Sequence, residues 1–215
     1  MLELYGVARS RATRNLWLLY ETGQPFVLKR VIQAYRANPN ADLTTQSPEF
    51  LALSPAAAVP VLKDGDLVVS ESLAINLYLA KKAGAPLGPK DAGEDALMIQ
   101  WALYAACSVE PFAIKIMYAY SENRAATDAG RAEIAAMTET LARPLGVLET
   151  HLAKHGHLVG GRFTVADVNM AEIVRYAGSE PGYLEKYPAV KRWYDACQAR
   201  PAFKKMWEQR LAEPV

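Results

Sequence analysis

The amino-acid sequence predicts a small α/β domain followed by a larger all-helical domain. Strand-like and helix-like patterns alternate through residues 1–80, and no strand pattern recurs beyond them. Residues 91–215 show long helical periodicity and are rich in Ala, Leu, Glu and Lys. The intervening residues 81–90 combine glycine and proline in the manner of a linker. We therefore expect two domains, 1–80 and 91–215, joined by a linker at 81–90.

The α/β domain is expected to begin with a strand, a helix and a second strand. Residues 2–5 alternate in polarity like a half-buried strand that stops at Gly6. Residues 14–21 place their large apolar side chains on one helical face. Residues 27–32 are rich in β-branched side chains and predict the second strand.

A hairpin and a further helix are expected to complete this domain. Asp64-Gly65 is a strong hairpin-turn signal between the apolar residues 61–62 and 67–69. Ser70 then precedes an apolar-periodic helix that contains Leu73, Ile75, Leu77 and Tyr78. The predicted order is β-α-β, a loop, and then β-β-α.

Composition excludes several classes of protein. Among 215 residues, 24 Lys and Arg face 23 Asp and Glu without any charged block, which excludes a phosphate-binding stripe for nucleic acid. Hydrophobic residues at 51% indicate a folded protein, and no apolar run approaches the ~20 residues of a membrane helix. Two cysteines, Cys107 and Cys197, cannot form a disulfide framework, and no secretion signal is evident. We expect a cytoplasmic protein that binds neither membrane nor nucleic acid.

Familiar catalytic and metal motifs are missing from the sequence. It contains no Gly-rich phosphate loop, no H-E-x-x-H and no C-x-x-C. His151, His155 and His157 lie close together but lack a matching cysteine or carboxylate, so we predict a histidine-rich helix end without metal. Both cysteines lie in apolar helical surroundings and are expected to fill the core. Thr164 and Asp167 have the spacing of a capping box, which is a structural signal.

The junction between the first strand and the first helix is a candidate anion site. Residues 6–14 are small or polar at the point where helix N–H groups are expected to be free. Such donors and the helix dipole stabilise a negative charge. Ser10 or Thr13 would add a hydroxyl there. The alternative is that Ser10 only caps the helix.

Two further segments carry polar groups suited to a peptide ligand. Pro60 follows Val59 where a strand is expected to begin, a position that tolerates proline. A cis bond between them would turn the Val59 N–H and C=O outward, as a strand edge to which a peptide can add. At the next helix start, the Ser72 hydroxyl can hold a carboxylate and Glu71 an ammonium, although Ser-Glu-Ser is also an ordinary helix start. Together the three segments predict a site for a peptide with an amino-acid end.

Over essentially its whole length the sequence resembles a cytosolic glutathione transferase, of the bacterial, serine-type kind that is similar to the theta and phi classes. The resemblance lies in the order and spacing of L-Y-G-V-A-R-S-R-A-T-R, S-P-E-F-L-A-L-S-P-A-A-A-V-P-V-L, D-G-D-L-V-V-S-E-S-L-A-I, G-G-R-F-T-V-A-D-V and R-P-A-F. It implies a thioredoxin-like N-terminal domain, an all-α C-terminal domain, a homodimer, and glutathione as co-substrate without a metal.

The resemblance also implies a role for each site residue. Val59 and Pro60 would form the edge that pairs with the cysteinyl residue, and Glu71 with Ser72 would hold the γ-glutamyl end. Ser10, four residues before Arg14, would stabilise the thiolate. The electrophile would contact apolar and small side chains from both domains: Val7, Ala8, Tyr104, Cys107, Ser108, Pro111 and Phe112.

The sequence departs from the family at the expected glycyl end of the site. Ala57 and Ala58 replace a glycine and a long polar side chain, and Thr45-Gln46 replaces a basic position. Lys29, Arg30, Arg36 or Arg11 would have to substitute.

The function implied is conjugation of glutathione to hydrophobic electrophiles, as in detoxification. One alternative is glutathione-dependent reduction of peroxides or disulfides. Another is a non-catalytic binding module, which the alanines at 57 and 58 favour and the intact Ser10, Glu71 and Ser72 oppose.

Overall fold

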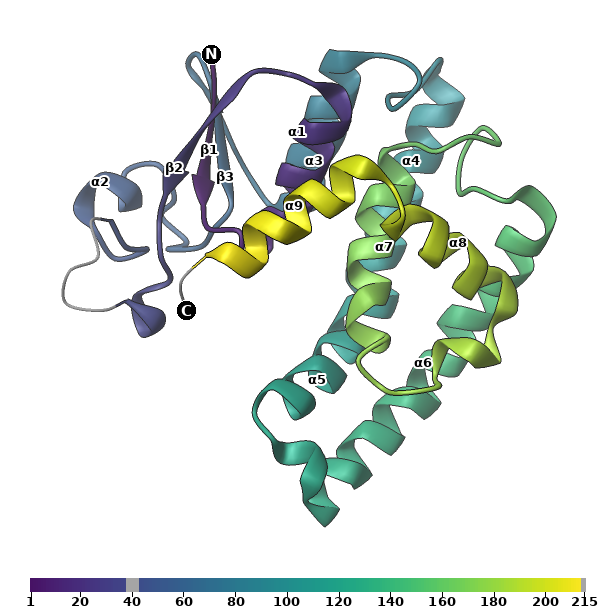
Figure 1. The fold of residues 1–215 in the computed structure, drawn as a ribbon. Coiled ribbons are helices and arrows are strands. Elements are labelled where there is room, and N and C mark those ends of the chain that lie inside the picture. The colour runs from purple at the N-terminus through teal and green to yellow at the C-terminus, as the bar shows by residue number, and fades with distance from the viewer. Residues whose placement is uncertain (38–42, 214–215) are drawn as a thin grey trace. The chain divides into compact units, whose positions relative to one another are not determined.

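The computed structural model describes residues 1–37 and 43–213. The chain forms two compact units, shown in Figure 1. The first combines Met1–Gly88 with Arg200–Val215, and the second is Pro89–Ala199. The boundary at Gly88 falls inside the predicted linker, whose first three residues instead continue a helix. The predicted second domain was too long, because residues 200–215 belong with the N-terminal unit.

A four-stranded mixed sheet forms the centre of the first unit. The strands are β1 (Leu2–Gly6), β2 (Phe26–Arg30), β3 (Val61–Asp64) and β4 (Leu67–Ser70), in the spatial order β2-β1-β3-β4. β1 and β2 are parallel, whereas β1–β3 and β3–β4 are antiparallel. The predicted element order is thereby confirmed, and Gly65 occupies the hairpin turn with φ 61°.

Helices cover both faces of this sheet. α1 (Ala12–Thr22) and α3 (Ser72–Ala83) lie on one face, and the short α2 (Pro48–Leu51) lies on the other (Figure 1). A 3₁₀ turn, η1 (Ala34–Arg36), precedes α2. α1 and α3 are joined by buried amides, because Asn15 Nδ2 donates to Asn76 Oδ1 at 2.8 Å. Asn76 Nδ2 in turn donates to the Arg14 carbonyl at 3.1 Å.

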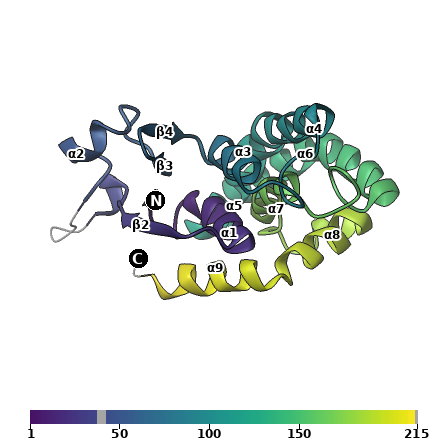
Figure 2. The ribbon, with the colours of Figure 1, turned by 90° about the horizontal axis from the view of Figure 1, so that it is seen from above.

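The last helix, α9 (Pro201–Ala212), packs beside α1 (Figure 2). Trp17 and Phe203 meet edge to face with ring centroids 4.9 Å apart. Arg200 forms two hydrogen bonds with the Glu21 carboxylate, at 2.6 and 2.8 Å. These contacts cover the face of α1 that would otherwise expose Trp17, and they explain why the end of the chain belongs to the first unit.

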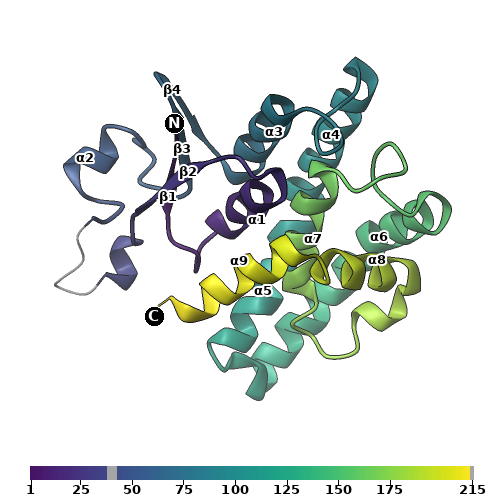
Figure 3. The same cartoon turned by 45° about the horizontal axis from the view of Figure 1, so that its top comes forward.

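The second unit is entirely helical. Its long helices are α4 (Ala92–Tyr104), α5 (Glu110–Ser121), α6 (Asp128–His155), α7 (Val165–Ala177) and α8 (Pro188–Gln198). A π-helical turn, η2 (Ala105–Val109), joins α4 to α5, and the 3₁₀ turns η3 (Arg124–Ala126) and η4 (Leu184–Lys186) lie in loops. α7 is buried along almost its whole length, and α4, α5 and α8 pack against it (Figure 3).

α4, η2 and α5 form one continuous helix, Ala92–Ser121, that is long and apolar enough to cross a membrane by length and composition. No such segment was expected from the sequence. In its most apolar window the mean hydropathy is 1.3 and 39% of the window is buried. Its packing against α6 and α7 is that of a core helix in a bundle.

The carboxylate of Asp167 joins three parts of the helical unit. Its Oδ2 accepts hydrogen bonds from the N–H and hydroxyl of Thr164, at 2.8 and 3.1 Å, and the predicted capping box is confirmed. Its Oδ1 accepts from the Leu158 N–H at 3.2 Å and from Trp193 Nε1 at 2.8 Å. Asp167 is fully buried, so if its carboxylate were removed, no water would replace it as the acceptor for these donors.

Asp167→Ala should therefore lower the free energy of unfolding by about 3–5 kcal/mol, because it strands several buried donors at once. Urea denaturation followed by circular dichroism measures this loss. Asp195→Ala, on the exposed side of α8, is the matched control and should leave the midpoint almost unchanged. Equal midpoints for both variants would contradict the role of Asp167.

Candidate functional site

The Ser10 hydroxyl lies in the tight turn between β1 and α1. Ser10 Oγ donates to the Val7 carbonyl at 2.7 Å and accepts from the Ala12 N–H at 3.1 Å. Its side chain is half-buried, whereas Thr13 is fully buried and donates to the Ser10 carbonyl at 3.1 Å. The N-cap residue of α1 is Arg11, so Ser10 does not occupy the cap position, although its Oγ accepts from the first N–H of the helix; it presents the more accessible hydroxyl of the two.

The expectation of free backbone donors in this turn is wrong for five of them, since the N–H groups of Thr13 and Arg14 donate to the carbonyls of Ser10 and Arg11 at 3.3 and 3.2 Å, and three others are also occupied. The Arg9 N–H donates to Glu213 Oε2 at 2.8 Å, the Ser10 N–H to the Val7 carbonyl at 3.1 Å, and the Ala12 N–H to Ser10 Oγ. The sequence could not show the contact of Arg9, because Glu213 lies 204 residues away from it, whereas the partners of Ser10 and Ala12 lie within the turn. The helix dipole and the Ser10 hydroxyl remain as groups that favour an anion.

Gly6 brings the Ser10 turn and the Val59-Pro60 segment together. The Val59–Pro60 bond is cis, as hypothesised. A Cβ added at Gly6 would lie 3.8 Å from Ser10 Oγ, 3.6 Å from Val59 Cβ and only 3.1 Å from Ala12 Cβ. The Ser10 hydroxyl and the Val59 side chain therefore both lie close to Gly6, where an added Cβ would be crowded against Ala12.

Ser72 and Glu71 begin α3 on the same side of the sheet as α1. Glu71 is exposed and has φ 68°, a conformation that side chains rarely adopt. Ser72 is 5% exposed, and its Oγ accepts a hydrogen bond from Arg14 NH1 at 3.0 Å. Asn15 Nδ2 donates to the Ser72 carbonyl at 2.8 Å. Because a hydroxyl has two lone pairs and one hydrogen, the Arg14 contact leaves Ser72 able to donate to a ligand carboxylate.

Sequence reasoning used Arg14 only for its spacing from Ser10 and missed its contact with Ser72. Arg14 is 1% exposed, and it is buried in α1 beside two other polar side chains, Thr13 and Asn15. A buried arginine needs a polar partner, which Ser72 supplies.

The residues predicted to contact an electrophile divide between the two units. Val7 and Ala8 are buried in the β1–α1 turn. The other five occupy the helix from α4 through η2 to α5, half-buried or exposed: Tyr104, Cys107, Ser108, Pro111 and Phe112. The π-helical turn has a local cause, since Pro111 lacks an N–H and its ring crowds the carbonyl four residues earlier. Burial raises the pKa of Tyr104.

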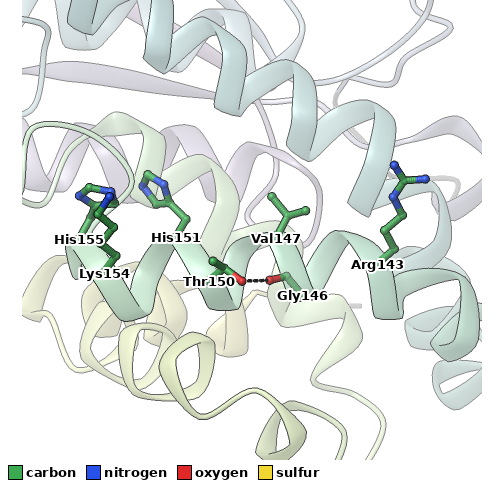
Figure 4. Close-up of a pocket in the computed structure, with 7 residues that line it drawn as sticks. All are labelled: Arg143, Gly146, Val147, Thr150, His151, Lys154 and His155. Carbon is green, nitrogen blue, oxygen red and sulfur yellow. Dashed lines mark hydrogen bonds between the residues drawn. The ribbon is translucent and has the colours of Figure 1, made fainter.

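A separate groove of about 560 Å³ runs along α6, as Figure 4 shows. It is lined by Arg143, Gly146, Val147, Thr150, His151, Lys154 and His155. The rings of His151 and His155 lie 4.7 Å apart, and His151 Nε2 lies 3.0 Å from the Leu158 carbonyl. His151 therefore contacts carbonyls beyond its helix. Among residues 1–37 and 43–213, no group of three His, Cys, Asp or Glu side chains is arranged to hold a metal.

The basic side chains near the expected glycyl end differ in their surroundings. Arg36 NH1 donates to the Arg9 carbonyl at 2.7 Å, whereas Arg11 is exposed. Ala58 is exposed, and Thr45 Oγ accepts from the Ala34 N–H at 3.1 Å. Thr45 thus holds its own loop.

Two family models match the chain: the glutathione S-transferase N-terminal domain over residues 9–82 and the C-terminal domain over residues 95–201. The chain is 36% identical to glutathione S-transferase 3 of Zea mays, across 95% of this chain and 92% of that protein. The chain belongs to the glutathione S-transferase family. It is also 29% identical to elongation factor 1-gamma of Rattus norvegicus, across 80% of this chain but only 39% of that protein.

Solved structures agree with this glutathione S-transferase fold. The chain resembles glutathione transferase F7 of Populus trichocarpa, with a TM-score of 0.83 and 26% identity across 98% of this chain and 99% of that one. It resembles the theta-class enzyme of Xanthomonas axonopodis pv. citri, solved with glutathione bound, with a TM-score of 0.78 and 28% identity across 95% of each chain. The thioredoxin-like N-terminal domain and the all-α domain are thus confirmed.

Gly6→Ala should destabilise this glutathione S-transferase by about 2–4 kcal/mol, the sum of backbone strain at φ 152° and crowding against Ala12. Gly65→Ala separates the two effects, because no atom lies within 4 Å of its added Cβ and only strain of about 1–2 kcal/mol remains. Chemical denaturation measures both. Equal losses of stability in the two variants would show that a methyl group at Gly6 is not crowded by Ala12.

Proposed function

We propose that this protein conjugates the thiolate of glutathione to hydrophobic electrophiles, as a serine-type member of the family related to the theta and phi classes. The observation that carries the proposal is the close approach of Ser10 Oγ and Val59 to the same glycine, Gly6. Its likeness to a theta-class structure with glutathione bound supports the choice of thiol. Its relatives include proteins of plants, of a bacterium and of a mammal, so the bacterial kind stays a sequence-based expectation.

In this proposal α3 and the Val59 edge hold the peptide. Glu71 accepts from the ammonium of the γ-glutamyl group, and Ser72 donates to its carboxylate. Arg14 keeps the Ser72 oxygen in place through its 3.0 Å hydrogen bond and adds a positive charge nearby. The backbone of Val59 pairs with the cysteinyl residue as an added strand would.

Ser10 then stabilises the thiolate, which is the nucleophile. A free thiol has a pKa of about 8.5, and each unit by which the site lowers it corresponds to about 1.36 kcal/mol. Ser10 turns its hydrogen from the Val7 carbonyl to the sulfur, while the Ala12 N–H still donates to Oγ and polarises the hydroxyl. The sulfur forms a bond to the electrophilic carbon, and the leaving group departs with its electron pair.

A homodimer in the cytoplasm belongs to the same proposal. Large apolar side chains stay exposed on α4, at Leu97, Ile99 and Leu103, and on the edge strand β4, at Leu67 and Val68. Exposed apolar surface of this kind is typical of an interface. Both cysteines are free thiols, which suits a reducing compartment.

Two other functions are alternatives to this proposal. The same thiolate can attack oxygen or sulfur, which would make the protein a glutathione-dependent peroxidase or disulfide reductase. A non-catalytic binding module is favoured by the alanines at 57 and 58 and by the likeness to elongation factor 1-gamma, which is not named as a transferase. The hydroxyl of Ser10 just before α1 and that of Ser72 at the start of α3 favour the enzyme.

Retention on immobilised glutathione, followed by assays with a chloronitroaromatic and with cumene hydroperoxide, separates the three functions. Conjugation of the chloronitroaromatic is the expected result. Turnover of the hydroperoxide alone would favour the reductase, and binding without either turnover would favour the module.

Ser10→Ala should lower the rate of conjugation at neutral pH by roughly 10- to 1000-fold, the range for loss of one donor to a developing or resident anion. Its pH–rate profile should move to higher pH, because the bound thiol keeps its proton longer. Thr13→Val should leave the profile in place, since Thr13 already donates to the Ser10 carbonyl. A profile that moves only in Thr13→Val would reassign the role.

Ser72→Ala should weaken glutathione binding by about 1–2 kcal/mol, the scale of one hydrogen bond to a charged group. It should raise the Michaelis constant for glutathione more than it lowers kcat. Titration calorimetry provides the affinity, with Ser70→Ala at the exposed end of β4 as the control. Equal affinities for the two variants would remove Ser72 from the site.

A further inference from the structure

Three charged side chains hold the backbone of the two residues that precede Ser10. Arg210 NH1 donates to the Ala8 carbonyl at 2.7 Å, and Arg36 NH1 donates to the Arg9 carbonyl at 2.7 Å. The Arg9 N–H donates to Glu213 Oε2 at 2.8 Å. Arg210 and Glu213 both come from the end of the chain.

Glu213 is the centre of this arrangement. Its side chain is only 9% exposed, and its Oε1 lies 3.3 Å from Arg30 NH1. Its backbone carbonyl also accepts from Arg9 Nε at 2.9 Å. A buried carboxylate is stable only when charges and hydrogen bonds compensate it, and Arg9 and Arg30 supply both.

α9 gives Glu213 a rigid base. The helix is fastened to α1 near its start by Arg200 and Glu21, and further along by Tyr20, whose hydroxyl donates to Gln209 Oε1 at 2.5 Å. Figure 2 shows α9 running beside α1, and the contacts of Arg210 and Glu213 join its end to the turn before α1. The end of α9 is thus set against the turn that begins α1.

We propose that Glu213 is a positioning residue for Ser10. The Glu213 carboxylate fixes the peptide at Arg9, and the turn from Val7 to Ala12 then sets the direction of Ser10 Oγ. Catalytic groups must be held within about 0.5 Å of their working position, and a misplacement of about 1 Å can cost a hundredfold in rate. The catalytic part of this inference rests on the proposed function.

In this proposal Glu213 acts by accepting a hydrogen bond from the Arg9 N–H, and not through an effect of its charge on the thiol. A negative charge beside a thiolate would oppose its formation. Both carboxylate oxygens are engaged, with the Arg9 N–H and with Arg30. Glu213→Gln keeps an oxygen that can accept from Arg9 and removes the charge, so it separates the two effects.

The test compares the full-length Glu213→Ala and Glu213→Gln proteins with Tyr20→Phe as the matched control, which removes one α1–α9 hydrogen bond away from the turn. Thermal melting confirms that each variant folds. Amide hydrogen exchange of the peptide that contains residues 7–12 should quicken in Glu213→Ala, remain close to wild type in Glu213→Gln, and stay unchanged in Tyr20→Phe.

The kinetic result should follow the exchange result. Glu213→Ala should lower kcat by about 10- to 100-fold, with a smaller change in the KM for glutathione, and should move the pH–rate profile to higher pH. Glu213→Gln should retain most of kcat. Unchanged exchange in Glu213→Ala, or an equal loss of kcat in Glu213→Gln and Glu213→Ala, would overturn the proposal.

The exchange measurement also distinguishes this inference from the proposed function. If the wild-type protein lacks conjugating activity but Glu213→Ala still quickens exchange at residues 7–12, the proposed function is overturned and the positioning of the Ser10 turn by Glu213 is supported. If the wild type conjugates glutathione but exchange is unchanged in Glu213→Ala, the proposed function is supported and the positioning role of Glu213 is overturned.

Discussion

Buried hydrogen bonds between α1 and α3 fix the distance between the two ends of the candidate site. Arg14 donates to Ser72, Asn15 to Asn76, and Asn76 back to the Arg14 carbonyl. Ser10 lies just before the start of α1 and Ser72 begins α3, so a shift of one helix along the other would move Ser10 relative to Ser72. Buried polar groups stay paired in only a few arrangements, and apolar contacts alone would permit sliding. The polar seam therefore sets the register on which the site depends.

The end of the chain completes the same unit from the other side of α1. Trp17 is covered by Phe203, and the Ser10 turn is held by Arg210 and Glu213. The N-terminal unit therefore includes residues from both ends of the sequence, with the whole helical unit inserted between them. The contacts at Arg9 span more than 200 residues, so the geometry of the Ser10 turn depends on a helix from the far end of the sequence.

Sequence patterns predicted the features that depend on near neighbours. The strand and helix order, the Gly65 turn and the capping box at Asp167 each follow from a few adjacent residues. The four-residue α2 is too short for a periodic signal, and the amphipathic pattern of α9 does not say which helix it covers. Within the site, local motifs indicated Ser10 and Ser72, but the partners of Arg14 and Arg9 are distant in sequence. The occupied N–H of Arg9 escaped prediction for this reason, whereas those of Ser10 and Ala12 bond within the turn and were missed because its tight local conformation was not predicted.

The hydrogen bonds of Ser10 limit how much of the thiolate's stability its hydroxyl provides. Turning the hydrogen from the Val7 carbonyl to sulfur gives up a neutral hydrogen bond of about 0.5–1.5 kcal/mol and gains a charged one of about 1.5–3 kcal/mol. The Val7 carbonyl still accepts from the Ser10 N–H at 3.1 Å, so it is not left without a partner. The net gain of about 1–1.5 kcal/mol corresponds to about one pKa unit. To lower the pKa of the thiol by two units, the site therefore needs a second source of stabilisation. The turn places the N-terminus of α1 closest to the sulfur. A helix N-terminus stabilises an anion by about 0.3–1 kcal/mol at an exposed end and by up to ~2 kcal/mol when it is partly buried.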